Sequence, residues 1–270
     1  MKKLICLVVL SLVASFAQAQ NPEPLENKAF KNGETLIYDL YYNWKFIWVK
    51  AGSATLSTVS TRYNGKSAWR THLISRGNSR ADKFWVMRDT LLSYTTDSLI
   101  PLYFRKGAQE GDRYTVDEVF YSYPGANSVA LRQHYRNKHG ELKKKSVTSR
   151  TPVYDMISML CRARSFDASK LRKGQKIKFL MADGDDIENS TIIFRGREKF
   201  KANNGTTYRC LKLSFVEYED GKEKEIITFF VTDDKNHLPV RLDLNLRFGS
   251  AKAFLNVVRG NRYPLTSIVK

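Results

Sequence analysis

The sequence predicts a mainly β protein: a curved antiparallel meander, forming a half-barrel or an open barrel, with one amphipathic helix packed against it. Three observations lead to this prediction. Apolar and polar residues alternate in several runs, short turn signals separate the runs, and helical periodicity occurs once. Period-two alternation is typical of strands with one buried face, and short turns between such strands favour hairpins.

The alternation is clearest between Val240 and Phe248. Every second residue is apolar, and the residues between them are Arg241, Asp243, Asn245 and Arg247. Successive side chains of a strand point to opposite faces of the sheet. We therefore expect Leu242 and Leu244 to lie on a buried or ligand-facing side.

A second alternating run is aromatic. It follows Leu36 and contains the groove candidates Tyr38, Tyr42, Trp44, Phe46 and Trp48. These side chains either line an apolar groove for acyl chains or sugars, or form part of the core. A turn near residues 43–45 would split the run into a hairpin and change which side chains share a face.

Turn signals such as Asn64-Gly65, Pro124-Gly125 and Asp220-Gly221 recur along the chain. They join successive strands by short connections, which indicates a meander. We find no internal repeat or domain boundary, so residues 33–270 are predicted to form a single β-rich domain.

The first residues predict export. Lys2 and Lys3 precede the apolar run Leu4–Val13, and Ala17-Gln18-Ala19 matches a cleavage pattern. Residues 1–19 are therefore interpreted as a signal peptide, and 20–32 as a flexible leader. No later stretch is long enough to span a membrane. The expected location is the periplasm or the periphery of the outer membrane.

One segment has helical spacing. Thr151 and Pro152 fit the N-cap and the first helical position, and Ile157 and Leu160 belong to the apolar face that follows. An amphipathic helix ending near Arg164 is expected.

The chain is strongly basic, with a formal charge of +18. Such an excess favours polyanionic partners, and export makes nucleic acid the least suitable of them. Lipid headgroups and acidic glycans remain, with an envelope protein as a further partner. The anion-binding candidates are Arg195, Arg197, Lys199 and Lys201, expected on one strand face, and Lys143, Lys144 and Lys145. The alternative is a solvated basic surface.

Metal, cofactor and catalytic motifs are not evident. The four histidines do not have zinc-ligand spacing, and Asp183, Asp185 and Asp186 lack the pattern of a calcium loop, so a solvated turn is expected there. No metal, cofactor or enzymatic activity is predicted. Cys161 and Cys210 either form a disulfide in an oxidising compartment or remain buried thiols.

Several short motifs resemble those of domain-of-unknown-function family 3108, which consists of exported bacterial proteins. They extend over nearly the whole chain and comprise Gly33–Tyr38, Lys50–Ala54, Trp85–Asp89, Pro101–Tyr103, Tyr154–Met156 and His237–Val240. The resemblance implies a β-rich periplasmic protein without assigned chemistry. The predicted architecture is also similar to the half-barrel of periplasmic lipoprotein carriers, an analogy of fold alone.

These observations favour a non-enzymatic envelope-binding protein whose ligand is a lipid or an acidic glycan. A second hypothesis is an assembly or structural protein that docks onto a partner through a strand edge or the basic face. A third is a hydrolase of envelope polymers, which needs converging carboxylates. Asp117 and Glu118 are adjacent on a strand and should face opposite sides, which counts against it.

Overall fold

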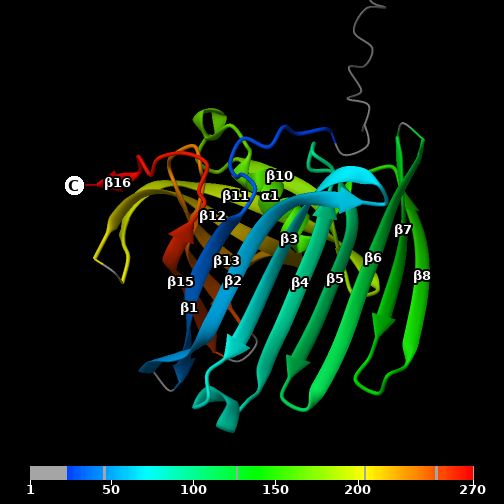
Figure 1. Cartoon of the computed structure of the whole chain (residues 1–270), viewed down its shortest axis with the longest axis horizontal. Helices are drawn as coiled ribbons and strands as arrows, with labels where there is room; N and C mark the ends of the chain where they lie inside the picture. The colour runs from blue at the N-terminus through cyan, green and yellow to red at the C-terminus, as the bar shows by residue number, and fades with distance from the viewer. Residues whose placement is uncertain (1–22, 45–46, 126, 204, 247–248, 270) are drawn as a thin grey trace, which may run out of the picture.

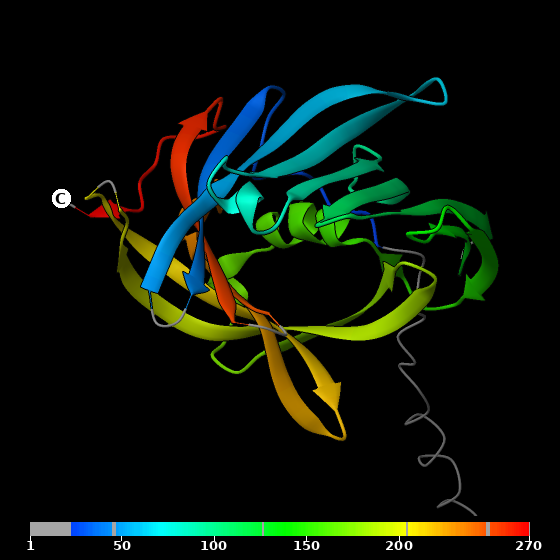
Figure 2. The same cartoon turned by 90° about the horizontal axis from the view of Figure 1, so that it is seen from below.

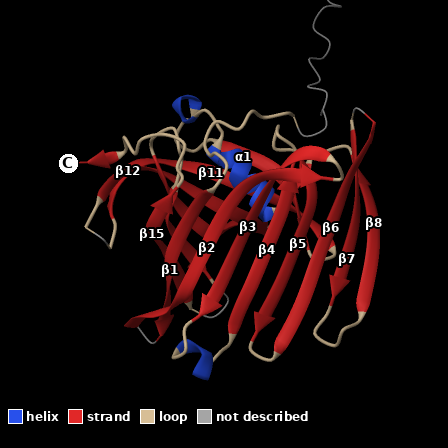
Figure 3. Ribbon diagram, viewed as in Figure 1, coloured by secondary structure: helices blue, strands red, loops and turns tan. Residues whose placement is uncertain are grey.

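The computed structural model describes residues 23–44, 47–125, 127–203, 205–246 and 249–269. Within them the chain is mostly strand, with one α-helix and two short 3₁₀ helices (Figure 3). The predicted signal peptide and the groove candidate Phe46 lie outside the described residues.

The strands of the first half are hairpin-connected and mostly long: β1 (Glu34–Trp44), β2 (Ile47–Tyr63), β3 (Lys66–Gly77), β4 (Met87–Thr95), β5 (Pro101–Glu110), β6 (Arg113–Gly125), β7 (Ser128–Arg136) and β8 (Leu142–Ser149). Those of the second half are β9 (Val153–Tyr154), β10 (Lys176–Asp183), β11 (Asp186–Lys201), β12 (Thr207–Glu219), β13 (Lys222–Thr232), β14 (Pro239–Asn245), β15 (Ser250–Arg259) and β16 (Ile268–Val269). The helices are α1 (Met156–Arg164), η1 (Ala81–Lys83) and η2 (Ala168–Lys170).

Most neighbours in the sheet are consecutive in sequence. The described strands are ordered β8-β7-β6-β5-β4-β3-β2-β1-β15-β14-β13-β12-β11-β10-β9, and β16 pairs with β12 (Figure 1). The pairing of β1 with β15 joins the two halves, and the short β9–β10 pair is parallel while the others are antiparallel. The predicted meander is therefore confirmed.

The sheet curves into a nearly closed, barrel-like shape with α1 inside it (Figure 2). The edge strands β8 and β9 do not pair with each other. Side chains close this gap instead, because the β10–β11 turn lies against β5, β7 and β8. Gln133 of β7 donates to the carbonyls of Gly184 and Asp186, and Lys145 of β8 donates to the carbonyl of Asp185.

The turn at residues 183–186 was expected to be solvated. It is a hairpin turn in which Asp183 and Asp186 are exposed. It is also the closing contact of the barrel, since Gln133 is fully buried beneath it. Lys106 of β5 adds a contact of 3.5 Å between its Nζ and Oδ1 of Asp183.

The helix α1 begins later than predicted. Its N-cap is Asp155, whose side chain accepts from the backbone N–H of Ser158, while the Ser158 hydroxyl accepts from the backbone N–H of Asp155. This capping box satisfies two backbone donors. Thr151 and Pro152 fail as the start because Val153 and Tyr154 pair with β10. The predicted end at Arg164 is confirmed.

Residues 23–32 are packed rather than loose. Ala29 and Phe30 are buried, and the Phe30 ring contacts Trp69 edge-on, with 5.2 Å between ring centroids. Arg162 of α1 donates to the carbonyl of Glu23, and Leu25 N–H donates to the carbonyl of Ser98. The expectation of a flexible leader is therefore wrong for this part, because its apolar residues complete the core beside α1.

Both cysteines of the domain are free. Cys161 lies on α1 with its Sγ 3.5 Å from Oγ1 of Thr71, and Cys210 lies on β12. Both are buried in different core clusters. Of the two alternatives, buried thiols are the ones observed, and the disulfide is not formed.

Candidate functional site

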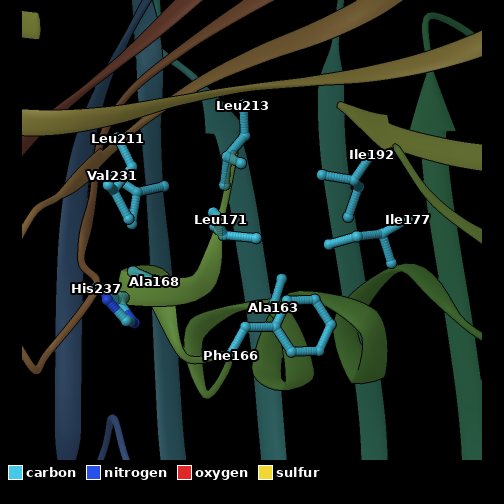
Figure 4. A pocket seen from close by; sticks show the side chains of 10 residues that line it. All are labelled: Ala163, Phe166, Ala168, Leu171, Ile177, Ile192, Leu211, Leu213, Val231 and His237. Carbon is cyan, nitrogen blue, oxygen red and sulfur yellow. The ribbon is translucent and has the colours of Figure 1, made fainter. Parts of the chain in front are cut away.

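Five strands present a continuous row of apolar side chains to the inside of the barrel-like sheet. In this row Leu213 pairs with Phe229, Phe229 with Leu242, Leu242 with Ala253, and Ala253 with Leu40. Directly paired residues of antiparallel strands share a face, and Leu213 points towards α1 (Figure 4). The row therefore faces inwards.

A second inward row runs alongside the first. It links Phe215, Ile227, Leu244, Ala251 and Tyr42 by the same kind of pairing. We call the two rows together the apolar inner face. Of the second row, Ile227, Leu244, Ala251 and Tyr42 are only partly buried although they point inwards. Solvent therefore reaches apolar surface inside the sheet.

The helix leaves little space where it covers the sheet. A cavity of about 10 Å³ lies between α1, η2 and β10–β13, bordered by Ala163, Phe166, Leu213 and Val231 among others (Figure 4). This is the space that about one water molecule requires. A ligand larger than water would have to lie on the part of the apolar inner face beyond α1.

The opposite wall of the interior is polar. Lys106 pairs across the strands with both Leu91 and Asp117, and Leu91 belongs to the core cluster around α1, so all three face inwards. The Lys106 ammonium lies 4.0 Å from Asp117 and 3.5 Å from Asp183. Asp89 shares this wall, where it accepts a hydrogen bond from Ser75.

Burial changes the pKa values of Asp117, Asp89 and Lys106. It raises the pKa of Asp117, an effect that Lys106 opposes, and it also raises the pKa of Asp89, where Glu110 acts in the same direction. For Lys106, burial lowers the pKa but Asp183 and Asp117 outweigh it, so the pKa is raised overall. Carboxylates thus outnumber the ammonium in this cluster, which disfavours anions.

The sequence matches the family model described as a protein of unknown function, DUF3108, over residues 37–256. This match covers most of the chain. The chain belongs to the DUF3108 family. The resemblance seen in the short motifs is therefore confirmed, and with it the expectation of a β-rich fold.

One solved structure extends the comparison beyond the DUF3108 family. It is a beta-barrel-like protein of domain-of-unknown-function family DUF1849 from Brucella abortus, with 10% sequence identity and a TM-score of 0.52. The similarity covers 86% of this chain and 98% of that chain. At this identity it shows a shared fold alone. No match to the curated proteins was found.

The aromatic run that contains the groove candidates of this DUF3108 protein is divided by the β1–β2 hairpin, the alternative considered for a turn near residues 43–45. Tyr38 and Tyr42 share the inner face of β1, where Tyr38 is buried and donates to the carbonyl of Pro239. Trp44 ends β1. Trp48 lies on β2, two residues before Lys50, so the two side chains share a face. Lys50 pairs with Tyr41, which faces outwards, and Trp48 therefore faces outwards too. The run therefore does not form one stripe: the turn reverses the chain and changes the face.

A row of aromatic side chains on the outer face was not predicted. Tyr63, Tyr94, Tyr103 and Phe120 come from four strands and contact one another, with 5.0 Å between the ring centroids of Tyr63 and Tyr94 and of Tyr103 and Phe120. We call this the outer aromatic row. Its members are half-buried. They are far apart in sequence, so only the register of the sheet reveals the row.

The four basic candidates on β11 do not share one face. Arg195 is displaced by a β-bulge between Phe194 and Gly196, and its side chain donates to Ser214. Arg197, Lys199 and Lys201 pair with Leu211, Arg209 and Thr207, on the other face. Because a bulge inserts one extra residue, strict alternation fails at this point.

The two arginines of this set are already neutralised. Arg195 forms an ion pair with Glu223 and lies 3.8 Å from Glu225, and Arg197 lies 3.3 Å from Asp233. Lys199 and Lys201 are exposed. The set therefore offers less free positive charge than its composition suggests.

The three lysines of β8 are exposed on an edge strand. Lys145 faces inwards with Gln133 and binds Asp185 and Asp186 of the closing turn, whereas Lys144 pairs with His134. Lysines on an edge strand oppose the addition of another strand. Their position fits protection of the edge better than a shared anion site.

Arg162 and Arg164, in the last turn of α1, are buried. Asp117 and Glu118 do point to opposite faces, since Asp117 faces Lys106 and Glu118 accepts from Tyr103. Among the described residues, no group of three or more histidine, cysteine or acidic side chains is arranged to hold a metal ion. In the same part of the chain, no helix is long and apolar enough to cross a membrane.

Proposed function

We propose that this protein is a non-enzymatic binding protein of the bacterial cell envelope, and that it holds a lipid acyl chain on the apolar inner face. The observation that carries the proposal is the partial exposure of Ile227, Leu244 and Ala251, which point into a barrel-like sheet whose helix α1 lies towards one end (Figure 1). Inward apolar side chains that stay partly exposed are suited to an apolar ligand.

The dimensions fit a linear chain. The apolar inner face crosses five neighbouring strands, which at about 4.8 Å per strand gives roughly 19 Å from first to last. Roughly ten methylene groups buried there contribute about 8 kcal/mol. That corresponds to micromolar affinity before the costs of association are subtracted.

The charges of the interior favour a lipid over an acidic glycan. Asp89, Asp117 and Asp183 lie around the ammonium of Lys106 on the opposite wall. The ammonium of Lys145, which also faces inwards, is paired with Asp186. The carboxylates of this wall would repel a polyanion that entered the interior. We therefore place the carboxylate-rich wall beside a neutral or cationic part of the ligand.

A second candidate function is docking onto an envelope protein, and the outer aromatic row favours it. Half-buried tyrosine and phenylalanine rings are typical anchors of protein interfaces. The strand edge is less suitable, because β8 is rich in exposed lysine.

Binding of a fluorescent fatty acid by the delipidated protein tests the acyl-chain proposal. The variant Leu244→Glu introduces a charge on the apolar inner face and should weaken binding at least ten-fold. The matched control is Leu142→Glu, which makes the same change at an exposed position on β8. No binding by the unchanged protein, or equal binding by both variants, would overturn the proposal.

A further inference from the structure

Large apolar side chains are exposed on three segments at one end of the barrel-like sheet, the lower end in Figure 1. The segments are the start of β2 (residues 47–50), residues 80–86 around and after η1, and Leu246 after β14; we call them the rim. The exposed fractions are 87% for Phe84, 64% for Ile47, 51% for Trp85, 45% for Val49 and Leu246, and 37% for Trp48. Exposure of this extent on neighbouring segments marks an interaction surface.

Contacts between the segments hold the rim together. The side-chain amide of Asn78 donates to the carbonyl of Lys50 on β2, and its oxygen accepts from the N–H of Ala81 at the start of η1. On the other side, Nζ of Lys252 on β15 lies 4.1 Å from the centre of the Trp48 ring. The apolar tips therefore belong to one connected surface.

The rim is also basic. Arg80 and Lys83 are exposed beside Phe84. Two of the nearby carboxylates are paired with cations of the same surface: Asp39 lies 2.8 Å from Lys50, and Asp82 lies 2.5 Å from Arg88. Glu110 and Asp112 are exposed beside Trp85, but Arg80, Lys83 and Lys252 outnumber them. Apolar tips with an excess of cations complement a surface that is anionic outside and apolar beneath.

We propose that the rim docks onto an anionic phospholipid bilayer, with Phe84, Trp85 and Ile47 inserted at the headgroup level. Cations of the rim then contact the lipid phosphates, and tryptophan takes the interfacial position that it prefers. The apolar tips are spread over three segments with cations between them, which suits a bilayer better than a protein partner, because the core of a protein interface is depleted of charged residues. The open end of the apolar inner face lies at the rim, since Tyr42 pairs with Val49.

Docking does not depend on acyl-chain binding, and sedimentation with vesicles tests it separately. The protein should sediment with vesicles of equal parts phosphatidylcholine and phosphatidylglycerol, but much less with phosphatidylcholine alone. Phe84→Ser should weaken binding about ten-fold, because it removes a large apolar contact. Its matched control is Ile268→Ser, which changes an exposed residue on β16, away from the rim.

A pair of charge variants separates the rim from diffuse attraction. Arg80→Gln with Lys83→Gln should weaken binding to the anionic vesicles roughly 25-fold, at about five-fold per cation. Lys199→Gln with Lys201→Gln makes an equal change of charge on β11 and should have little effect. No binding by the unchanged protein, or equal loss in the rim and control variants, would overturn the proposal. If the unchanged protein sediments with the anionic vesicles but does not bind the fatty acid, the proposed function is contradicted and docking is still supported.

Discussion

Arg164, in the last turn of α1, and Glu34, at the first residue of β1, form a fully buried ion pair. The guanidinium donates two hydrogen bonds to the carboxylate, at 2.6 and 2.9 Å, and further bonds to the carbonyl of Asn236. The pair joins the end of the helix to the start of β1 and to the loop that precedes β14. It thereby fixes the end of the helix against the sheet.

Breaking this pair should destabilise the protein strongly. In the intact pair the Arg164 side chain is 3% exposed and the Glu34 side chain 1%. Glu34→Gln removes the negative charge and leaves the Arg164 charge buried without its partner. We expect a loss of about 3–5 kcal/mol in the free energy of unfolding, measured by urea denaturation.

The matched control is Glu223→Gln, which removes the partner of Arg195 at a position about one third exposed. Solvent screens such a pair, so a loss below about 1 kcal/mol is expected. Equal losses in the two variants would show that the buried pair has no special role.

Asp155 should make stability depend on pH. Burial raises its pKa from 3.8 to about 6, so the folded state holds a proton that the unfolded state releases between these values. This contribution to stability is therefore present at low pH and is lost as the pH rises from about 4 to about 6. The loss is roughly 3 kcal/mol, at about 1.4 kcal/mol per pKa unit.

The variant Asp155→Asn tests whether this pH dependence of stability comes from Asp155. Asparagine is an equally good N-cap, so α1 should still form. Urea denaturation across the same pH range should show a flatter profile than that of the unchanged protein. An identical pH profile would assign the dependence to other groups.

The side chain of Gln133 should keep the barrel closed. Gln133→Ala removes two hydrogen bonds to the carbonyls of Gly184 and Asp186. We expect faster hydrogen exchange in residues 183–186 and a loss of about 1–3 kcal/mol. Arg132→Ala, on the exposed face of the same strand, is the control. Unchanged exchange in the turn would contradict this role of Gln133.

The two thiols should be unreactive in the folded protein. Burial raises the pKa of Cys161 to about 11 and that of Cys210 to about 12, so little thiolate exists at neutral pH. Iodoacetamide should label neither thiol until the protein is unfolded, when it should label both. A mass two hydrogens below that of the reduced chain would indicate a disulfide. That result, or labelling of the native protein, would refute this expectation.

Local patterns predicted the elements well but placed their faces less reliably. The alternation of Leu242 and Leu244 identified the inward side of β14, because that strand is regular through them. The hairpin in the aromatic run was one of the alternatives that the sequence left open. The β11 cations were misplaced by a bulge, which interrupts alternation.

Long-range contacts were beyond the reach of sequence patterns. The partner of Arg164 lies 130 residues away, and the packing of Phe30 depends on Trp69 and α1. The rim is assembled from three segments that lie far apart in the sequence. Such sets arise from the register of the whole sheet, which a single sequence does not show.

Native mass spectrometry of the protein, purified gently from the envelope fraction, tests the central claim most directly. If the apolar inner face holds an acyl chain, a reproducible extra mass should be present, identified as lipid after denaturation and reduced in Leu244→Glu. A protein mass without any adduct, together with no uptake of added fatty acid, would contradict the claim.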